Sequence, residues 1–398
     1  MAFIKYALPV LAAAQAVFAQ GSDCGGGDTI TIRSQSDLDG YNSCETLNGN
    51  VELSNELSGT VTINGVQRIQ GALSSSGGEN ITRLSAPTLE TIEDAFSLEG
   101  TTRLSGLDFP RLTSVGEISF QAVPVLQNLG FTQGVTKASS VSIINTGLTS
   151  LDGISLNQVG SFIVTDNKDL QTVDVNNLKN ATNLINFAGN SDKLEIMLPN
   201  LASGTNLTIR NVSSVSIPSL KKLEGQLGFW GNTFESLSAP NLTESGDVVF
   251  EDNTRLNNLS LPVLETINGG FLITRNDELS SLSFPKLAQV SGAIDFSGAF
   301  DEAEIPSLEN VRGGFNMQST GNFSCDTFDN WEGSVIRGDY ECEASTNNPT
   351  TADGSSGSST SSGGGDSQPT DDAAILNGAS VPAMGLAAMF GLLVQNVL

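Results

Sequence analysis

The sequence predicts an all-β protein, a parallel β-solenoid whose coils of 21 to 23 residues stack along one axis. Three observations predict this fold: a proline motif that recurs with that period, a column of Asn residues with the same period, and the lack of sustained helical periodicity between them. A fixed period of roughly 20 to 50 residues is typical of proteins built from stacked repeats.

The proline motif is an aliphatic or aromatic residue, or Ala, followed by Pro-x-Leu. Its copies are separated by 23, 89, 19, 22, 22, 23 and 21 residues, and the largest gap is close to four times 22. The segment "LQTVDVNNL" keeps the motif inside that gap, with Asn176 in place of proline. Proline suits the corner of a coil, where its missing N–H removes no ladder hydrogen bond. The motif occurs at Pro87, Pro110, Pro199, Pro218, Pro240, Pro262, Pro285 and Pro306.

In the Asn column, each Asn closes a short apolar alternation, as Phe162 and Val164 precede Asn167. Alternation with period two, rich in β-branched and aromatic residues, predicts a strand with one face inward. Asn tolerates left-handed backbone and its amide both donates and accepts, so we expect stacked copies to hydrogen-bond along the solenoid as scaffold. The column comprises Asn167, Asn190, Asn232, Asn253 and Asn276, and we extend it to Asn145 and Asn211, whose apolar pairs lie one residue closer.

The repeats imply a rod. Roughly a dozen coils at about 4.8 Å per stacked strand give a length of about 55–60 Å. The exposed end strands need covering, because a free strand edge pairs with other chains. Segments 20–50 and 323–343 contain all four cysteines and are well placed to form the two caps.

The cysteines fall into two local pairs, Cys24 with Cys44 and Cys325 with Cys342. Four cysteines permit three connectivities, and sequence alone does not choose among them. We favour the local pairing, because the repeats between the pairs would hold the ends of the array apart. Export to an oxidising compartment favours disulfides, and the spacings match no zinc signature.

Both ends of the chain carry targeting signals. Residues 1–19 have one early cation, Lys5, and an apolar run that ends in small residues, which predicts a signal peptide cut after Ala19. Residues 377–398 place small residues before an uncharged apolar tail, which predicts a glycosylphosphatidylinositol (GPI) signal with attachment at Asn377 and removal of 378–398. A retained single-span helix is the alternative.

Between these signals we expect an ectodomain at 20–343 and a Ser/Thr/Gly-rich stalk at 344–376. Apolar residues almost vanish in the stalk, so it cannot bury enough surface to offset its ordering entropy, and we expect it to be disordered. Its Ser, Thr and Pro content suits O-glycosylation.

Composition excludes several functions. The chain has no histidine, which removes imidazole bases, Ser-His pairs and imidazole metal ligands. Its formal net charge of −26 argues against nucleic acid and anionic lipid surfaces as partners. We expect no metal or other cofactor, and contact with the membrane only through the GPI lipid.

The order of these parts resembles the fungal GPI-anchored cell-wall organisation proteins. The resemblance rests on the two cysteine pairs, the "P-x-L-x-x-(I/V)-x-G" coils, the late segment "NWEGSVIRGDYEC", and the Ser-rich stalk before a GPI signal. Repeats of that family look like the receptor L domain, a right-handed leucine-rich β-solenoid. The resemblance implies a non-catalytic protein of the outer plasma-membrane face and cell wall, needed for wall integrity and for assembly of the outer mannoprotein layer.

Candidate modification sites follow from the motif Asn-x-Ser/Thr without an intervening proline. Asn241 follows a corner proline and should face solvent, whereas Asn211 also stands in the Asn column, where an inward amide could not carry a glycan. The motif predicts N-glycosylation at Asn80, Asn180, Asn206, Asn211, Asn241, Asn258 and Asn322.

An enzyme is the main alternative, because parallel β-solenoids also house polysaccharide hydrolases and lyases that use acids alone. The candidate acids are Glu251, Asp252, Asp277 and Glu278, but we expect Asp252 to face Arg275 of the next coil as an exposed ion pair. We therefore assign no catalytic residue.

Trp230 and Trp331 are candidate sugar-stacking rings, with Trp230 expected outward on a strand and Trp331 expected in the core of the C-terminal cap. The expected partners are cell-wall glycans or wall mannoproteins, and an adhesin or receptor-like ectodomain is a further alternative.

Overall fold

The computed structural model of the protein describes residues 24–352. The signal peptide at 1–19, stalk residues 353–376 and the GPI signal with Asn377 lie outside the described residues. Within the described range, no helix is long and apolar enough to cross a membrane.

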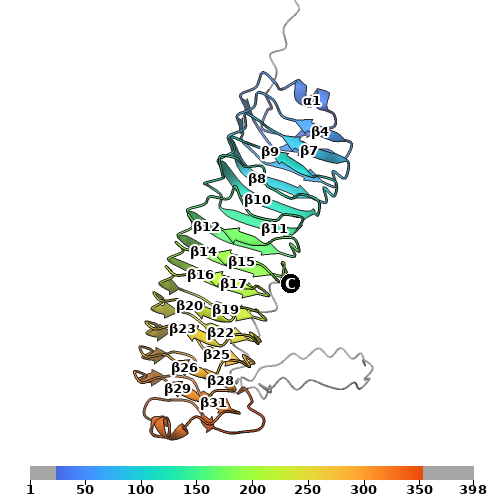
Figure 1. Ribbon diagram of the computed structural model, residues 1–398. Coiled ribbons are helices and arrows are strands. Elements are labelled where there is room, and N and C mark those ends of the chain that lie inside the picture. Colours follow the sequence, from blue (N-terminus) through green and yellow to red (C-terminus); the bar gives the residue numbers. More distant parts are fainter. Residues whose placement is uncertain (1–23, 353–398) are drawn as a thin grey trace, which may run out of the picture.

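The chain forms a parallel β-solenoid of about 14 turns with a repeat of about 22 residues, which confirms the predicted fold and exceeds the predicted dozen coils. Figure 1 shows the rod, with the N-terminal cap at the blue end and the C-terminal cap at the red end. One strand of each coil lies on one long side of the rod, where it pairs in parallel with its copies in the coils before and after. These strands are β1 (Ile30–Ile32), β3 (Val51–Leu53), β6 (Leu73–Ser76), β8 (Thr91–Glu99), β10 (Ser114–Val123), β11 (Ser140–Thr146), β12 (Gln158–Thr165), β14 (Asn180–Ala188), β16 (Ser203–Arg210), β19 (Leu227–Trp230), β22 (Val248–Glu251), β25 (Phe271–Thr274), β28 (Ile294–Gly298), β31 (Phe315–Ser319) and β32 (Tyr340–Glu343).

Shorter strands complete this 22-stranded sheet, which we call the main sheet. In the long strands β8 and β10, a bulge bends the strand, and in the later coils the same bend separates two strands. The shorter strands are β2 (Thr46–Leu47), β5 (Arg68–Ile69), β18 (Lys222–Leu223), β21 (Glu244–Ser245), β24 (Thr266–Ile267), β27 (Gln289–Val290) and β30 (Asn310–Val311).

A second side of the rod carries smaller parallel sheets, separated from the main sheet by the proline corners. Their strands are β4 (Gly59–Thr62), β7 (Ile81–Ser85), β9 (Gly106–Asp108), β13 (Thr172–Asp174), β15 (Glu195–Met197), β17 (Ser214–Ser216), β20 (Ser236–Ser238), β23 (Asn258–Ser260), β26 (Ser281–Ser283) and β29 (Glu302–Glu304). Both sides turn alternate apolar residues inward, so one hydrophobic core runs the length of the rod from Ile32 to Ile336.

The Asn column forms a buried ladder. The side chain of Asn232 donates to Asn253 Oδ1 at 2.8 Å, and that of Asn253 donates to Asn276 Oδ1 at 3.0 Å. Asn167 donates to Asn190 Oδ1 in the same way at 3.1 Å. All five Asn residues are buried, as the scaffold interpretation predicts.

The left-handed backbone lies one residue before the ladder and not at the Asn itself. Asp252 and Arg275, for example, have φ of +58° and +54°. Asn145 and Asn211 occupy this left-handed position, with φ of +53° and +61°, and both are exposed. The extension of the ladder to them is therefore wrong, because Thr146 and Val212 take the inward places and bond to the Asn residues of the next coil.

Glycines at the bend of the main sheet form a second continuous column, which we call the glycine spine: Gly246, Gly269, Gly292, Gly313 and Gly338. From Gly269 onward, the backbone N–H of each donates to the carbonyl of the glycine one coil earlier, at N–O distances of 2.9, 2.7, 2.8 and 3.0 Å. A Cβ on Gly292 would lie 2.7 Å from the carbonyl oxygen of Gly269, so the coils approach through backbone alone.

The N-terminal cap contains the short helix α1 (Gln35–Asp39), which buries Leu38 against the first coils. Ser34 caps the helix, and the Asp37 carboxylate accepts hydrogen bonds from the backbone N–H groups of Arg33 and Ser34. These two bonds hold the pKa of Asp37 below its ordinary value. The disulfide Cys24–Cys44 joins the cap to the chain that enters it.

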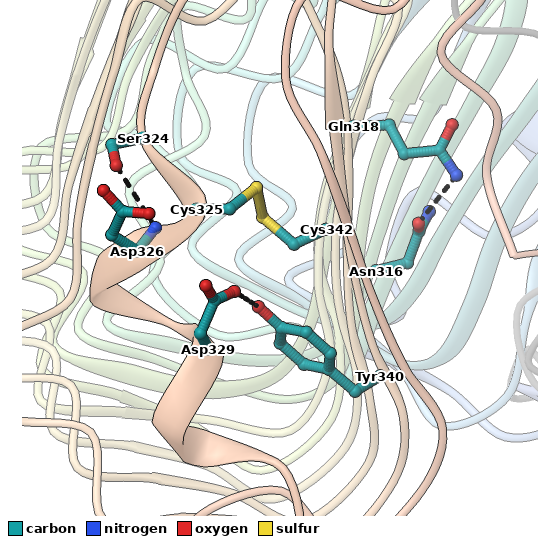
Figure 2. Close-up of a disulfide and its surroundings, with 8 residues drawn as sticks. All are labelled: Asn316, Gln318, Ser324, Cys325, Asp326, Asp329, Tyr340 and Cys342. Atoms are coloured by element: carbon teal, nitrogen blue, oxygen red, sulfur yellow. Dashed lines mark hydrogen bonds between the residues drawn. A yellow bond between two sulfur atoms is a disulfide. The ribbon is translucent and has the colours of Figure 1, made fainter.

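The C-terminal cap contains two 3₁₀ turns, η1 (Cys325–Thr327) and η2 (Asp329–Trp331), and its disulfide joins Cys325 to Cys342 on β32 (Figure 2). Tyr340 stacks on Phe315 with ring centroids 5.6 Å apart, and its hydroxyl donates to Asp329 at 3.3 Å. Burial, together with the Asp329 charge and hydrogen bond, raises the pKa of Tyr340 to about 12.

After β32 the chain turns back over the outer face of the main sheet. We call residues 349–352 the strap. Within it, Pro349 and Thr351 are buried. The backbone N–H of Thr350 donates to Gln318 Oε1 at 2.9 Å, and that of Ala352 donates to Asp295 at 3.0 Å. The first residues of the segment assigned to the stalk thus lie against the last coils.

Candidate functional site

The acidic candidates lie where main-sheet strands end, and Arg275 holds two of them. Its Nε donates to Asp252 Oδ1 at 2.5 Å, and its Nη2 pairs with the Glu251 carboxylate. The hydrogen bond that Arg275 donates to Asp252 is the main cause that raises the pKa of Arg275, and Glu251 adds to it while burial opposes it. The predicted pair between Asp252 and Arg275 is present. Asp277 and Glu278 are exposed in the turn that follows.

This arrangement suits an ion-pair network. Glu251 also accepts a hydrogen bond from the Trp230 indole N–H at 3.0 Å, so it is held by two donors. An acid pair for hydrolysis needs one carboxyl that keeps its proton and a second one facing it across a substrate. Here both carboxylates instead pair with one guanidinium. Within residues 24–352, no three Cys, Asp or Glu side chains are placed to hold a metal ion.

Trp230 is half-buried on the outer face of the main sheet, and its ring lies against Gly228. The Arg210 guanidinium lies over the ring, with its carbon 4.3 Å from the centroid, and burial lowers the pKa of Arg210 although Glu251 opposes this. Because Gly228 and the Arg210 guanidinium both contact the Trp230 ring, little of the ring surface is free to stack on a sugar. Trp331 is half-buried in the C-terminal cap and packs against the core there, 4.9 Å from Phe328 between centroids.

The glycosylation motifs are spread over several sides of the rod. Asn80 and Asn258 lie at strands of the second side, Asn241 at a proline corner, Asn211 in the left-handed turn and Asn322 before the C-terminal cap, and all five are exposed. Asn180 and Asn206 are half-buried on the main sheet. Because Asn211 stands outside the ladder, the sequence-based objection to its glycosylation does not hold.

The outer face of the main sheet carries a column of serines in the N-terminal half of the rod. Ser74, Ser97, Ser119 and Ser142 are direct register partners in successive coils, and each is half-buried. None of the four strands that carry this column, β6, β8, β10 and β11, contains a glycosylation motif. It is a regular row of hydroxyls, one per coil.

A polar groove of about 860 Å³ opens at the bend of the main sheet beside the serine column. Gly116 and Gly160 line it together with hydroxyl and amide side chains, among them Ser139, Gln158 and Thr182. Sequence reasoning missed this groove, because it depends on bulges that let neighbouring coils differ in length at the bend.

The chain is similar in sequence to GPI-anchored proteins of fungal cell walls and cell surfaces. A model of the family described as "Ecm33: GPI-anchored cell wall organization protein" matches residues 1–42. The protein ecm33 of Aspergillus fumigatus is 61% identical over 400 residues, covering 100% of both chains. The chain belongs to the Ecm33 family.

Other relatives agree with this family. A cell surface GPI-anchored protein of Arthroderma benhamiae is 42% identical over 89% of this chain and 90% of its own, and the cell wall protein ecm33 of Schizosaccharomyces pombe is 34% identical over 87% and 82%. No solved structure gives a significant match. Like other Ecm33 proteins, the chain is a GPI-anchored protein of the fungal cell surface and wall, involved in cell-wall organisation.

Proposed function

We propose that this Ecm33 protein organises the wall without catalysis, by holding wall glycans or wall mannoproteins along the rod. In this way it supports assembly of the outer mannoprotein layer. It contacts the membrane through its GPI lipid alone and binds no nucleic acid, which its net charge of −26 would repel.

The serine column is the observation that carries the proposal. Ser74, Ser97, Ser119 and Ser142 present one hydroxyl per coil in register, at a spacing of about 4.8 Å. A polysaccharide, which carries hydroxyl groups on every sugar, can hydrogen-bond to such a row at many points at once. Weak individual contacts then add up to a stronger overall affinity. The absence of glycosylation motifs on this column leaves it open to a partner.

The polysaccharide hydrolase remains the second candidate, and the contacts of Arg275 speak against it. Glu251 and Asp252 share that cation, and the Trp230 indole also binds Glu251. Both carboxylates are therefore engaged in structural contacts, whereas a hydrolytic pair needs two carboxyls that face each other across the substrate.

The test mixes the secreted ectodomain, residues 20–352, with purified β-glucan, chitin, mannan or wall mannoproteins. Co-sedimentation and newly formed reducing or unsaturated ends are read from the same tubes. We expect binding without new ends, and loss of binding in the double variant Ser97→Arg/Ser119→Arg. The matched control Ser214→Arg/Ser236→Arg places the same charges on the second side of the rod and should bind normally.

Two results would contradict the proposal. New chain ends that disappear in Asp252→Asn would show catalysis. Binding that survives in Ser97→Arg/Ser119→Arg, or that fails equally in the control, would exclude the serine column as the contact surface.

A further inference from the structure

The polar groove at the bend of the main sheet has the chemistry of a carbohydrate site. Thr136, Ser139 and Thr182 contribute hydroxyls, and Asn157 and Gln158 contribute amides, all from exposed side chains. These groups donate and accept hydrogen bonds without charge, as the hydroxyl and acetamido groups of sugars do. A groove of about 860 Å³ has room for a ligand of small-molecule size.

Charge plays little part in this groove. Among the described residues, Glu93 and Lys137 are the charged ones that line it, one of each sign. The Glu93 carboxylate already pairs with Arg68 of the preceding coil. Apart from Lys137, the groove therefore offers neutral hydrogen-bonding groups, which suit the hydroxyl and acetamido groups of a sugar.

Asn180 stands at the edge of this groove. It is the register partner of Gln158, which lines the groove. Thr182 also lines the groove, and it lies two residues after Asn180 on β14, so both side chains point to the same face of the strand. Thr182 is also the hydroxyl residue of the glycosylation motif that begins at Asn180.

The side chain of Asn180 is already oriented. Its Oδ1 accepts a hydrogen bond from Ser203 Oγ at 3.1 Å, on the side of the next coil. Among the described residues Nδ2 makes no hydrogen bond, so it is available to carry a sugar. By contrast, the side-chain amide of Asn241 donates to the Pro218 carbonyl at 2.7 Å.

We propose that the groove holds the first sugars of an N-glycan carried by Asn180. During export the amide Nδ2 bonds to the first N-acetylglucosamine, loses one proton and displaces the lipid pyrophosphate that carried the oligosaccharide. The Asn180 carbonyl keeps its bond to Ser203, and the two core N-acetylglucosamine units lie along Gln158 and Ser139. The sugar becomes part of the rod surface, in contrast to a freely moving glycan on Asn258.

The test follows glycan release from the intact, folded glycoprotein by an endoglycosidase that cuts between the two core N-acetylglucosamine units. Glycopeptide mass spectrometry reads each site at successive times. A glycan that spends nine-tenths of its time in the groove is cut about tenfold more slowly than an unprotected one. We expect this difference between Asn180 and Asn258 in the native protein, and equal rates after reduction and unfolding.

A groove-filling variant separates the groove from the burial of Asn180 itself. Ser139→Trp should expel the sugars and bring the rate at Asn180 close to that at Asn258, and Thr136→Trp serves the same purpose should the first variant fail to fold. An unoccupied Asn180, equal rates in the native protein, or slow release that persists in a folded groove-filling variant would each overturn the proposal.

Discussion

Asn253 donates its side-chain amide to the side-chain oxygen of Asn276, 3.0 Å away in the next coil. The same amide also donates to the Phe229 carbonyl at 3.1 Å, and Asn253 Oδ1 accepts from both the backbone and the side chain of Asn232. One buried residue therefore satisfies the polar groups of three coils, without contact with solvent.

Replacing Asn253 by Ala should destabilise the protein by at least about 2 kcal/mol, because it leaves buried donors of Asn232 without their acceptor. Denaturant unfolding monitored by tryptophan fluorescence measures the change. Asn257→Ala is the matched control, since Asn257 is exposed four residues later, and it should fall within about 0.5 kcal/mol of the parent. Equal stabilities of the two variants would contradict the ladder's role.

Gly292→Ala should cost about 1–3 kcal/mol, because its Cβ would meet the backbone of Gly269 at 2.7 Å and coils in contact cannot easily separate. Gly26→Ala is the control, since a Cβ there would meet no atom within 4 Å. The midpoints of thermal unfolding compare the two. A Gly292→Ala variant as stable as Gly26→Ala would show that the spine tolerates side chains.

The raised pKa of Tyr340 predicts a loss of stability at alkaline pH. Its folded pKa of about 12 exceeds the ordinary value of 10.0, so between these values the unfolded chain releases a proton that the folded chain retains. The contribution of Tyr340 to stability is complete below pH 10 and is lost as the pH rises to about 12. Stability measured at several pH values in this window should fall less steeply in Tyr340→Phe than in the parent. Parallel curves would contradict the assignment.

Removing the strap should loosen the last coils locally. An ectodomain that ends at residue 343 lacks the bonds from Thr350 and Ala352 to Gln318 and Asp295, worth about 0.5–1.5 kcal/mol each. Hydrogen exchange should speed up in β28 and β31 relative to an ectodomain that ends at residue 352. Exchange in β6 and β8 is the internal control and should not change, because stacked coils interact mainly with their neighbours. Unchanged protection in β31 would mean that the strap contributes nothing.

The sequence predicted those parts of the fold that recur at the same place in successive coils. Proline corners, inward alternations and the five ladder residues from Asn167 to Asn276 follow from spacing, and so does the pair between Asp252 and Arg275, which occupy the same place in successive coils. The error at Asn145 and Asn211 is a shift of one residue. Both positions favour Asn, one for its left-handed backbone and the other for its inward amide, so residue type alone does not distinguish them.

Features that the repeat does not mark, such as how closely the backbones of two coils approach or where a coil has a bulge, were not predictable in this way. The glycines of the spine occur as ordinary turn residues in the sequence, and only stacking shows that Gly292 must touch Gly269. The groove beside Gly160 likewise depends on bulges in β12 and β14. The ring of Trp230 is covered by the guanidinium of Arg210 from the preceding coil, which the repeat does not indicate.

The glycine spine also fixes the spacing between successive coils from Gly246 to Gly338. Because backbone atoms of successive coils are in contact along it, the distance from coil to coil is fixed by covalent dimensions and hydrogen bonds, and no side chain can compress or lengthen it. The length of this part of the rod can therefore change only by whole coils, in steps of about 4.8 Å for each 22 or so residues gained or lost.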